Sequence, residues 1–127
     1  MAMKQALMLS TTTVLLLAVT SSVEGQVERN LKAGKLKYHT YCVSCHGISG
    51  KGDGPATTSL NPKPRDITNG DHMNTLSDKY IFDIIKGGGA SVKKSPLMPA
   101  WSGALNDKEI CNLVTYVRSL GRQKPPK

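Results

Sequence analysis

Apolar side chains recur every three or four residues in three segments, and this pattern predicts three amphipathic helices. The segments are residues 27–39, residues 77–86 and a last one that begins at Asn106 and ends at Gly121. Their inward-facing positions are Val27, Leu31, Gly34 and Tyr38, then Tyr80, Ile81, Ile84 and Ile85, then Ile110, Leu113, Val114, Val117 and Leu120. Because no segment has a convincing strand pattern, we expect an all-α fold.

The residues at the helix ends agree with these boundaries. Asn106 and Glu109 have the spacing of a capping box ahead of the last helix, and glycines at residues 87–89 end the middle one. Gly34 is costly inside a helix, which indicates that another helix crosses closely at that point. Residues 47–70 are rich in Gly, Pro, Thr and Asn, so we expect a long irregular connection of the kind that wraps a cofactor.

Residues 1–25 have the pattern of an export signal. Lys4 gives a positive start, an apolar run from Ala6 through Val19 follows, and small or β-branched residues precede a predicted cleavage site near Gly25. The run is too short and too rich in threonine for a spanning helix of about 20 apolar residues. We expect a cleaved signal peptide over residues 1–25 and one domain over residues 26–127, without stable membrane insertion. Retention of the leader as an anchor is the alternative.

The composition indicates that a bound group completes the core. Without the leader, the chain of 127 residues retains about a hundred, enough for one domain with a thin core. It has only one Phe and one Trp. A planar cofactor would fill the interior that large aromatic side chains leave empty.

The formal net charge of +8 bears on the choice of partners. The lysines are scattered, with no basic run and no interleaved aromatic residues, so nucleic acid is not expected as a partner. A basic surface would instead attract acidic proteins and speed their encounter. The glycine-rich runs lack the ending and the preceding strand of a phosphate-binding loop.

Cysteine spacing gives the most specific chemical signal. The chain has 3 cysteines, and Cys42-Val43-Ser44-Cys45-His46 has the C-x-x-C-H form in which two thiols add to the vinyl groups of haem. The adjacent His46 then reaches the iron as the proximal ligand. A thioredoxin-like redox pair and half of a zinc site are the alternatives, but the chain has neither an alternating αβ pattern nor a second cysteine pair. Cys111 lies on an apolar helical face and is expected to be a buried thiol.

The chain resembles a class I c-type cytochrome over the whole segment after the leader. Gly34 and Tyr38 precede Cys42 at intervals of four, as the helix-crossing pair of that family does. Leu113 and Tyr116 match their partners on the final helix. The other matching runs, in chain order, are Cys42-Val43-Ser44-Cys45-His46-Gly47, Gly50-Lys51-Gly52-Asp53-Gly54-Pro55, Pro64-Arg65-Asp66 and Leu97-Met98-Pro99-Ala100-Trp101. The second run is similar to that of a bacterial periplasmic subgroup with Gly-Asp-Gly-Pro after the haem motif.

The resemblance implies roles for further residues. Met98 would be the distal iron ligand, held by a loop that Pro96 and Pro99 stiffen. His72, Met73 and His39 are the competing ligands. The carbonyl of Pro55 would accept the Nδ1 proton of His46. Arg65 is a candidate partner of a haem propionate and Trp101 could pack near the same edge, although each also fits an ordinary surface or core position.

We therefore expect a cytochrome c-like fold with three to four helices and long loops around one covalently attached haem c. The resemblance implies a periplasmic electron-transfer protein that carries single electrons between redox partner proteins and is not itself an enzyme, because a Met/His pair leaves no open iron position. Two alternatives remain. The chain could be a cytochrome subunit of a larger periplasmic oxidoreductase, or its haem could bind or reduce a small ligand.

Overall fold

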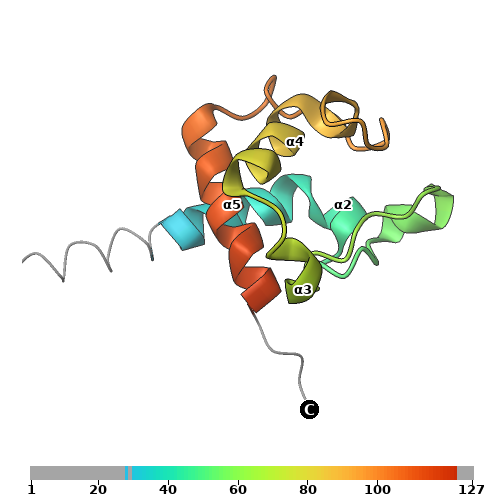
Figure 1. Ribbon diagram of the computed structural model, residues 1–127, viewed down its shortest axis with the longest axis horizontal. Helices are drawn as coiled ribbons and strands as arrows, with labels where there is room; N and C mark the ends of the chain where they lie inside the picture. The colour runs from blue at the N-terminus through green and yellow to red at the C-terminus, as the bar shows by residue number, and fades with distance from the viewer. Residues whose placement is uncertain (1–27, 29, 123–127) are drawn as a thin grey trace, which may run out of the picture.

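A computed structural model describes residue 28 and residues 30–122 of the chain. The predicted signal peptide, residues 1–25, lies outside the described residues. The described part is helical without strands, which confirms the predicted all-α class (Figure 1). In chain order, its elements are an N-terminal helix over residues 30–41, α2 (Val43–His46), the 3₁₀ helix η1 (Pro55–Ser59), α3 (Gly70–Met73), α4 (Asp78–Ser91) and α5 (Asp107–Arg122).

The N-terminal helix crosses α5 at Gly34, as the sequence predicted (Figure 1). A Cβ atom at Gly34 would overlap the backbone carbonyl of Asn112 and lie 2.9 Å from the Cβ of Tyr116. One turn later, the rings of Tyr38 and Tyr116 pack with centroids 5.2 Å apart. Leu113, the other expected partner, is 1% exposed. The crossing therefore depends on glycine for its closeness and on two tyrosines for its buried area.

The start of α5 is fixed by a reciprocal capping box. The N–H of Glu109 donates to Oδ1 of Asn106 at 3.0 Å, and the N–H of Asn106 donates to Oε2 of Glu109 at 3.0 Å. The other oxygen of Glu109, Oε1, lies 2.6 Å from Lys37 Nζ on the N-terminal helix. The cap thus sets both where α5 begins and how its first turn meets the neighbouring helix.

The middle helix is longer than predicted but bends where the glycines stand. Ser77 caps α4, since its Oγ accepts the N–H of Tyr80 at 3.1 Å. Helical hydrogen bonding continues to Ser91, yet Gly88 has a non-helical φ of 76°. The regular helix therefore ends at the predicted glycines, and a further turn follows the bend.

Apart from η1, the connection from Gly47 to Asn69 is irregular, as expected, but hydrogen bonds tie it to its surroundings. Tyr38 donates its hydroxyl to the carbonyl of Gly47 at 2.8 Å, and the Gly52 N–H donates to the His46 carbonyl at 2.9 Å. The N–H of Ile67 donates to the Gly50 carbonyl at 2.8 Å. These bonds hold the loop beside α2, so that the chain after His46 folds back on the cysteine motif.

One sequence expectation is wrong. Cys111 is exposed, because it lies on the side of α5 away from the apolar stripe that contacts the core. Cys111 follows buried Ile110 directly in the sequence, but one residue turns a helix by about 100°. Its side chain therefore points away from the face that Ile110 buries. Within the described part of the chain, no helix is both long and apolar enough to cross a membrane.

Candidate haem site

A cavity of about 870 Å³ lies between α2, α4, α5 and the loop residues 60–69 and 92–101. This volume is in the range of small-molecule and cofactor sites, about 300–1,000 Å³. Part of the apolar core lines this cavity, including Ile81, Ile85 and Leu113. The predicted site residues that line it are Cys42, Cys45, His46, Arg65, Met98 and Trp101. Among the predicted set, Pro55 does not line the cavity.

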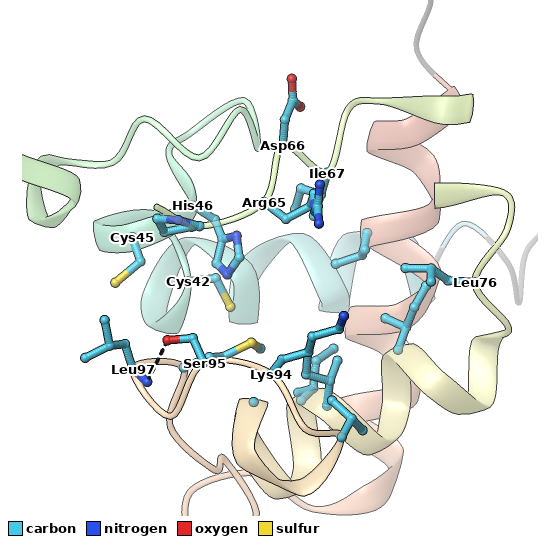
Figure 2. Close-up of a pocket in the computed structure, with 18 of the residues that line it drawn as sticks. Cys42, Cys45, His46, Arg65, Asp66, Ile67, Leu76, Lys94, Ser95 and Leu97 are labelled. Atoms are coloured by element: carbon cyan, nitrogen blue, oxygen red, sulfur yellow. Dashed lines mark hydrogen bonds between the residues drawn. The ribbon is translucent and has the colours of Figure 1, made fainter. Parts of the chain in front are cut away.

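Cys42, Cys45 and His46 are brought to one wall by a single turn of helix. Cys42 is the N-cap of α2, and the N–H groups of Cys45 and His46 both donate to its carbonyl, at 3.2 and 2.8 Å. Residues three and four positions apart share a helix face. Figure 2 shows the three side chains on the same side of the cavity. The C-x-x-C-H spacing therefore presents two thiols and an imidazole together.

Burial favours the neutral forms of the Cys42 thiol and the His46 imidazole at this wall. It raises the pKa of the Cys42 thiol to about 12, and the neighbouring Cys45 adds to the shift. Burial also lowers the pKa of the His46 imidazole, and the nearby Arg65 backbone opposes this only in part. A neutral imidazole is the form that ligates a metal ion.

The predicted hydrogen bond from His46 to the carbonyl of Pro55 is not formed. Among the described residues, the buried Nδ1 of His46 has no hydrogen-bond partner, and Pro55 is exposed in η1. The backbone of Arg65 only offsets part of the effect of burial on the pKa of this ring. A buried polar atom without a partner is costly. The fit to haem rests instead on the two thiols, the other ring nitrogen and the apolar lining, because an iron bound at that nitrogen would still leave Nδ1 in need of a protein acceptor.

Met98 lies on a loop that faces this wall. Met98 lines the cavity, and Figure 2 shows its neighbours Ser95 and Leu97 across the cavity from Cys42 and His46. The Ser95 hydroxyl accepts the N–H of Leu97 at 3.3 Å, which stabilises the turn before Met98. The loop that carries Met98 and the helical turn that carries His46 thus lie on opposite sides of one space.

Backbone hydrogen bonds attach the Met98 loop to α4. The N–H of Gly89 donates to the Met98 carbonyl at 2.9 Å, and that of Lys94 donates to the Gly89 carbonyl at 2.8 Å. Further along, the N–H of Trp101 donates to the Ile85 carbonyl at 3.1 Å. From the sequence, the glycines at residues 87–89 indicate only a helix end, and their contact with the Met98 loop is not evident. A glycine run shortly before a Pro-Leu-Met-Pro segment was the available signal.

Arg65 and Trp101 both reach the cavity, in different settings. Trp101 packs its ring 5.3 Å from that of Tyr41, another lining residue. Arg65 is exposed and lies with Lys63 at the border of the cavity. Trp101 thus has a packing role, and Arg65 is placed where a guanidinium could meet a carboxylate at the surface.

The competing ligands separate into two groups. His72 and Met73 line the cavity, whereas His39 does not. The Asn69 side chain caps α3 by accepting the N–H of His72 at 3.1 Å, and the Met73 side chain is buried in the core. Two side chains besides Met98 therefore remain available on geometric grounds.

Comparison with known proteins agrees with this site. The family model for "Cytochrome C oxidase, cbb3-type, subunit III" matches residues 29–117. The cbb3-type cytochrome c oxidase subunit CcoP of Azospirillum brasilense is 31% identical over 91 residues, which cover 72% of this chain and 28% of that protein. The chain thus spans less than a third of its relative. The match confirms the resemblance to class I c-type cytochromes, with covalently bound haem c as cofactor and electron transfer as role. The chain belongs to the cbb3-type cytochrome c oxidase subunit III family of c-type cytochrome domains.

Proposed function

We propose that the chain is an exported, periplasmic electron carrier whose haem iron is ligated by His46 and Met98. The observation that carries the proposal is the placement of Cys42, Cys45 and His46 on one wall of the cavity and of Met98 on the facing loop. We assign the domain to residues 26–127 and a cleaved signal peptide to residues 1–25.

Different residues around the cavity would attach the haem, ligate its iron and exclude water. Haem c supplies a one-electron iron couple when bound. Cys42 and Cys45 would anchor it through thioethers, and His46 would bind the iron from the same wall. The apolar side chains of Ile81, Ile85 and Leu113 would keep water from the site. If His46 and Met98 both ligate the iron, no open position would remain for a substrate, which favours a carrier over an enzyme.

The distribution of charge supports acidic redox partners. In the described part of the chain, the cations in ion pairs are Lys37, Lys79, Lys86 and Arg118, and none of them lines the cavity. The cations that do line it are Lys63, Arg65 and Lys94, and they outnumber the carboxylate among the lining residues, Asp66. We propose that this basic rim docks a partner protein with an acidic surface, and that salt slows the encounter.

A second candidate is a cytochrome subunit of a larger oxidoreductase. It is favoured by the 31% identity to CcoP, which is named as a subunit of a cbb3-type oxidase. Purification under native conditions separates the two: a stable co-purifying partner supports the subunit, and a monomer that exchanges electrons with an added partner in a salt-dependent way supports the free carrier.

The central test compares two methionines that line the same cavity. Met98→Leu and Met73→Leu both replace a thioether by an apolar side chain of similar volume. Haem should stay attached through denaturing extraction in the native chain and in both variants. The oxidised native protein should show the weak far-red band of sulfur-to-iron coordination. We expect Met98→Leu to lose this band, to lower the midpoint potential and to admit exogenous ligands, and Met73→Leu to retain the native spectrum.

Two results would contradict the assignment. If Met98→Leu keeps the band and Met73→Leu loses it, Met73 is the distal ligand. If the native protein lacks the band but keeps covalent haem, the cytochrome assignment stands, while Met98 gives way to His72 or to an open position for a small ligand.

A further inference from the structure

Arg118 makes the most extensive side-chain contacts of any cation in the described part of the chain, although it does not line the cavity. Its Nε donates to Oδ1 of Asp78 at 2.6 Å and its Nη1 donates to the Met73 carbonyl at 2.6 Å. Its Nη2 donates to the carbonyl of Leu76. The side chain is only 19% exposed. One guanidinium of α5 thus binds three groups of a single neighbouring segment.

That segment, residues 73–78, connects α3 to α4 and forms part of the cavity wall. Met73 and Leu76 both line the cavity, and Asp78 is the first residue of α4. Close packing brings α3 against the same end of α5: a Cβ at Gly70 would lie 2.6 Å from the Gly121 carbonyl oxygen. Turn hydrogen bonds, such as that from the Leu76 N–H to the Met73 carbonyl at 3.3 Å, shape residues 74–77 internally. The contacts with α5 place the segment against the rest of the fold.

We propose that Arg118 is a positioning residue of the haem site, which fixes the wall formed by Met73 and Leu76 by holding their backbone carbonyls. The inference rests on the proposed haem site. A guanidinium is suited to this role because its N–H groups point in fixed, diverging directions, so it can hold two carbonyls and a carboxylate at once. A lysine has the charge but not the planar fork.

Loss of the three hydrogen bonds of Arg118 should change the access of water to the cavity. Without Arg118, residues 74–77 would separate from α5 more often, and water would reach the cavity between Met73 and Leu76. Solvent access around a metal site changes its redox potential. Because water stabilises the more highly charged oxidised state, the midpoint potential should fall.

The experiment uses the full haem-bound protein and two substitutions at Arg118. Arg118→Met keeps an unbranched stem and removes every donor, and Arg118→Lys retains the charge opposite Asp78. The control is Lys86→Met, which removes another exposed contact between α4 and α5, the pair of Lys86 Nζ with Asp107 at 2.7 Å. Hydrogen exchange of the amides and the midpoint potential are measured for each variant.

We expect Arg118→Met to accelerate exchange at residues 73–78 about tenfold, with a lowered potential. Exchange in residues 30–41 should stay native. Arg118→Lys should show a smaller change of the same kind, and Lys86→Met should alter neither readout in this segment. Native exchange and potential in both Arg118 variants would overturn the proposal, as would equal changes in Lys86→Met. Failure of the proposed function is separate, because it would appear in the native protein as missing covalent haem or a missing far-red band.

Discussion

The backbone N–H of Gly89 donates a hydrogen bond of 2.9 Å to the carbonyl oxygen of Met98. The residue proposed as distal ligand is thereby attached to α4 at the bend that Gly88 introduces. A Cβ at Gly88 would lie 2.8 Å from both the Met98 carbonyl oxygen and the Ala100 nitrogen. The helix and the loop can approach this closely only because residue 88 has no side chain.

We therefore predict that Gly88→Ala weakens the hold on Met98. Its φ of 76° is unfavourable for alanine, and the methyl group has no space, so the free energy of unfolding should fall by about 1–3 kcal/mol. The far-red band of the oxidised protein should weaken at the same time. Gly103→Ala is the matched control, since a Cβ there meets nothing within 4 Å. An unchanged band in Gly88→Ala would show that the loop is held by other contacts.

The crossing at Gly34 predicts a defect of stability without a defect of ligation. In Gly34→Ala, the new methyl group meets the Asn112 carbonyl on α5, so we expect overpacking to cost about 1–3 kcal/mol. Denaturant unfolding should give a lower midpoint with the same slope, and the optical spectrum should stay native. Lys35→Ala, at the exposed neighbouring position, should be close to neutral. Equal midpoints for the two variants would argue that the helices separate at no cost.

The capping box of α5 allows a graded test. Asn106→Ala removes the acceptor of the Glu109 N–H and should lower the free energy of unfolding by about 1 kcal/mol. Asn106→Ser keeps a capping oxygen and should restore most of that loss. Thermal unfolding of the haem-bound protein measures both. If serine is no better than alanine, the stabilisation arises from contacts other than the cap.

Much of the fold could be predicted because single residues of distinctive type mark its helix ends and its closest helix crossing. The capping pair Asn106 and Glu109, the glycines that end the regular part of α4 and the crossing glycine Gly34 each act through their nearest neighbours in space. The exposure of Cys111 was predicted wrongly because a stripe of apolar residues does not fix its own edges. A side chain at the margin of a helix face is buried or exposed according to what packs beside it.

The site was predictable where spacing determines chemistry, and less so where tertiary contacts decide. The spacing from Cys42 to His46 places the two thiols and the imidazole within one helical turn. The partner of His46 Nδ1 depends on where a distant loop lies, and the expected contact with Pro55 is absent. The contacts of Arg118 with residues 73–78 could not be predicted either, because two of its acceptors are the backbone carbonyls of Met73 and Leu76, about 40 residues earlier in the chain.

Asp66, at the border of the cavity, gives a prediction for acid conditions. Its Oδ1 accepts the Thr68 hydroxyl at 2.6 Å and the Thr68 N–H at 2.8 Å, and the hydroxyl bond is the main reason that the pKa of this carboxyl is lowered. A carboxyl with a lowered pKa in the folded state stabilises the fold above its unfolded pKa, and that stabilisation is lost as the pH falls through the folded value. Thr68→Val should therefore be less stable than the native chain near neutral pH, and the gap should narrow below the ordinary value of 3.8.

Unfolding free energies measured from about pH 6 to about pH 2 test this expectation. The control is Thr58→Val, which removes a hydroxyl that donates to the Pro55 carbonyl at 3.4 Å and touches no carboxylate, so its effect should not vary with pH. A gap between Thr68→Val and the native chain that stays constant over the whole range would mean that the Thr68 hydroxyl stabilises the turn without acting on the charge of Asp66. Convergence of the two curves in acid would identify the charged form of Asp66 as the species that the turn recognises.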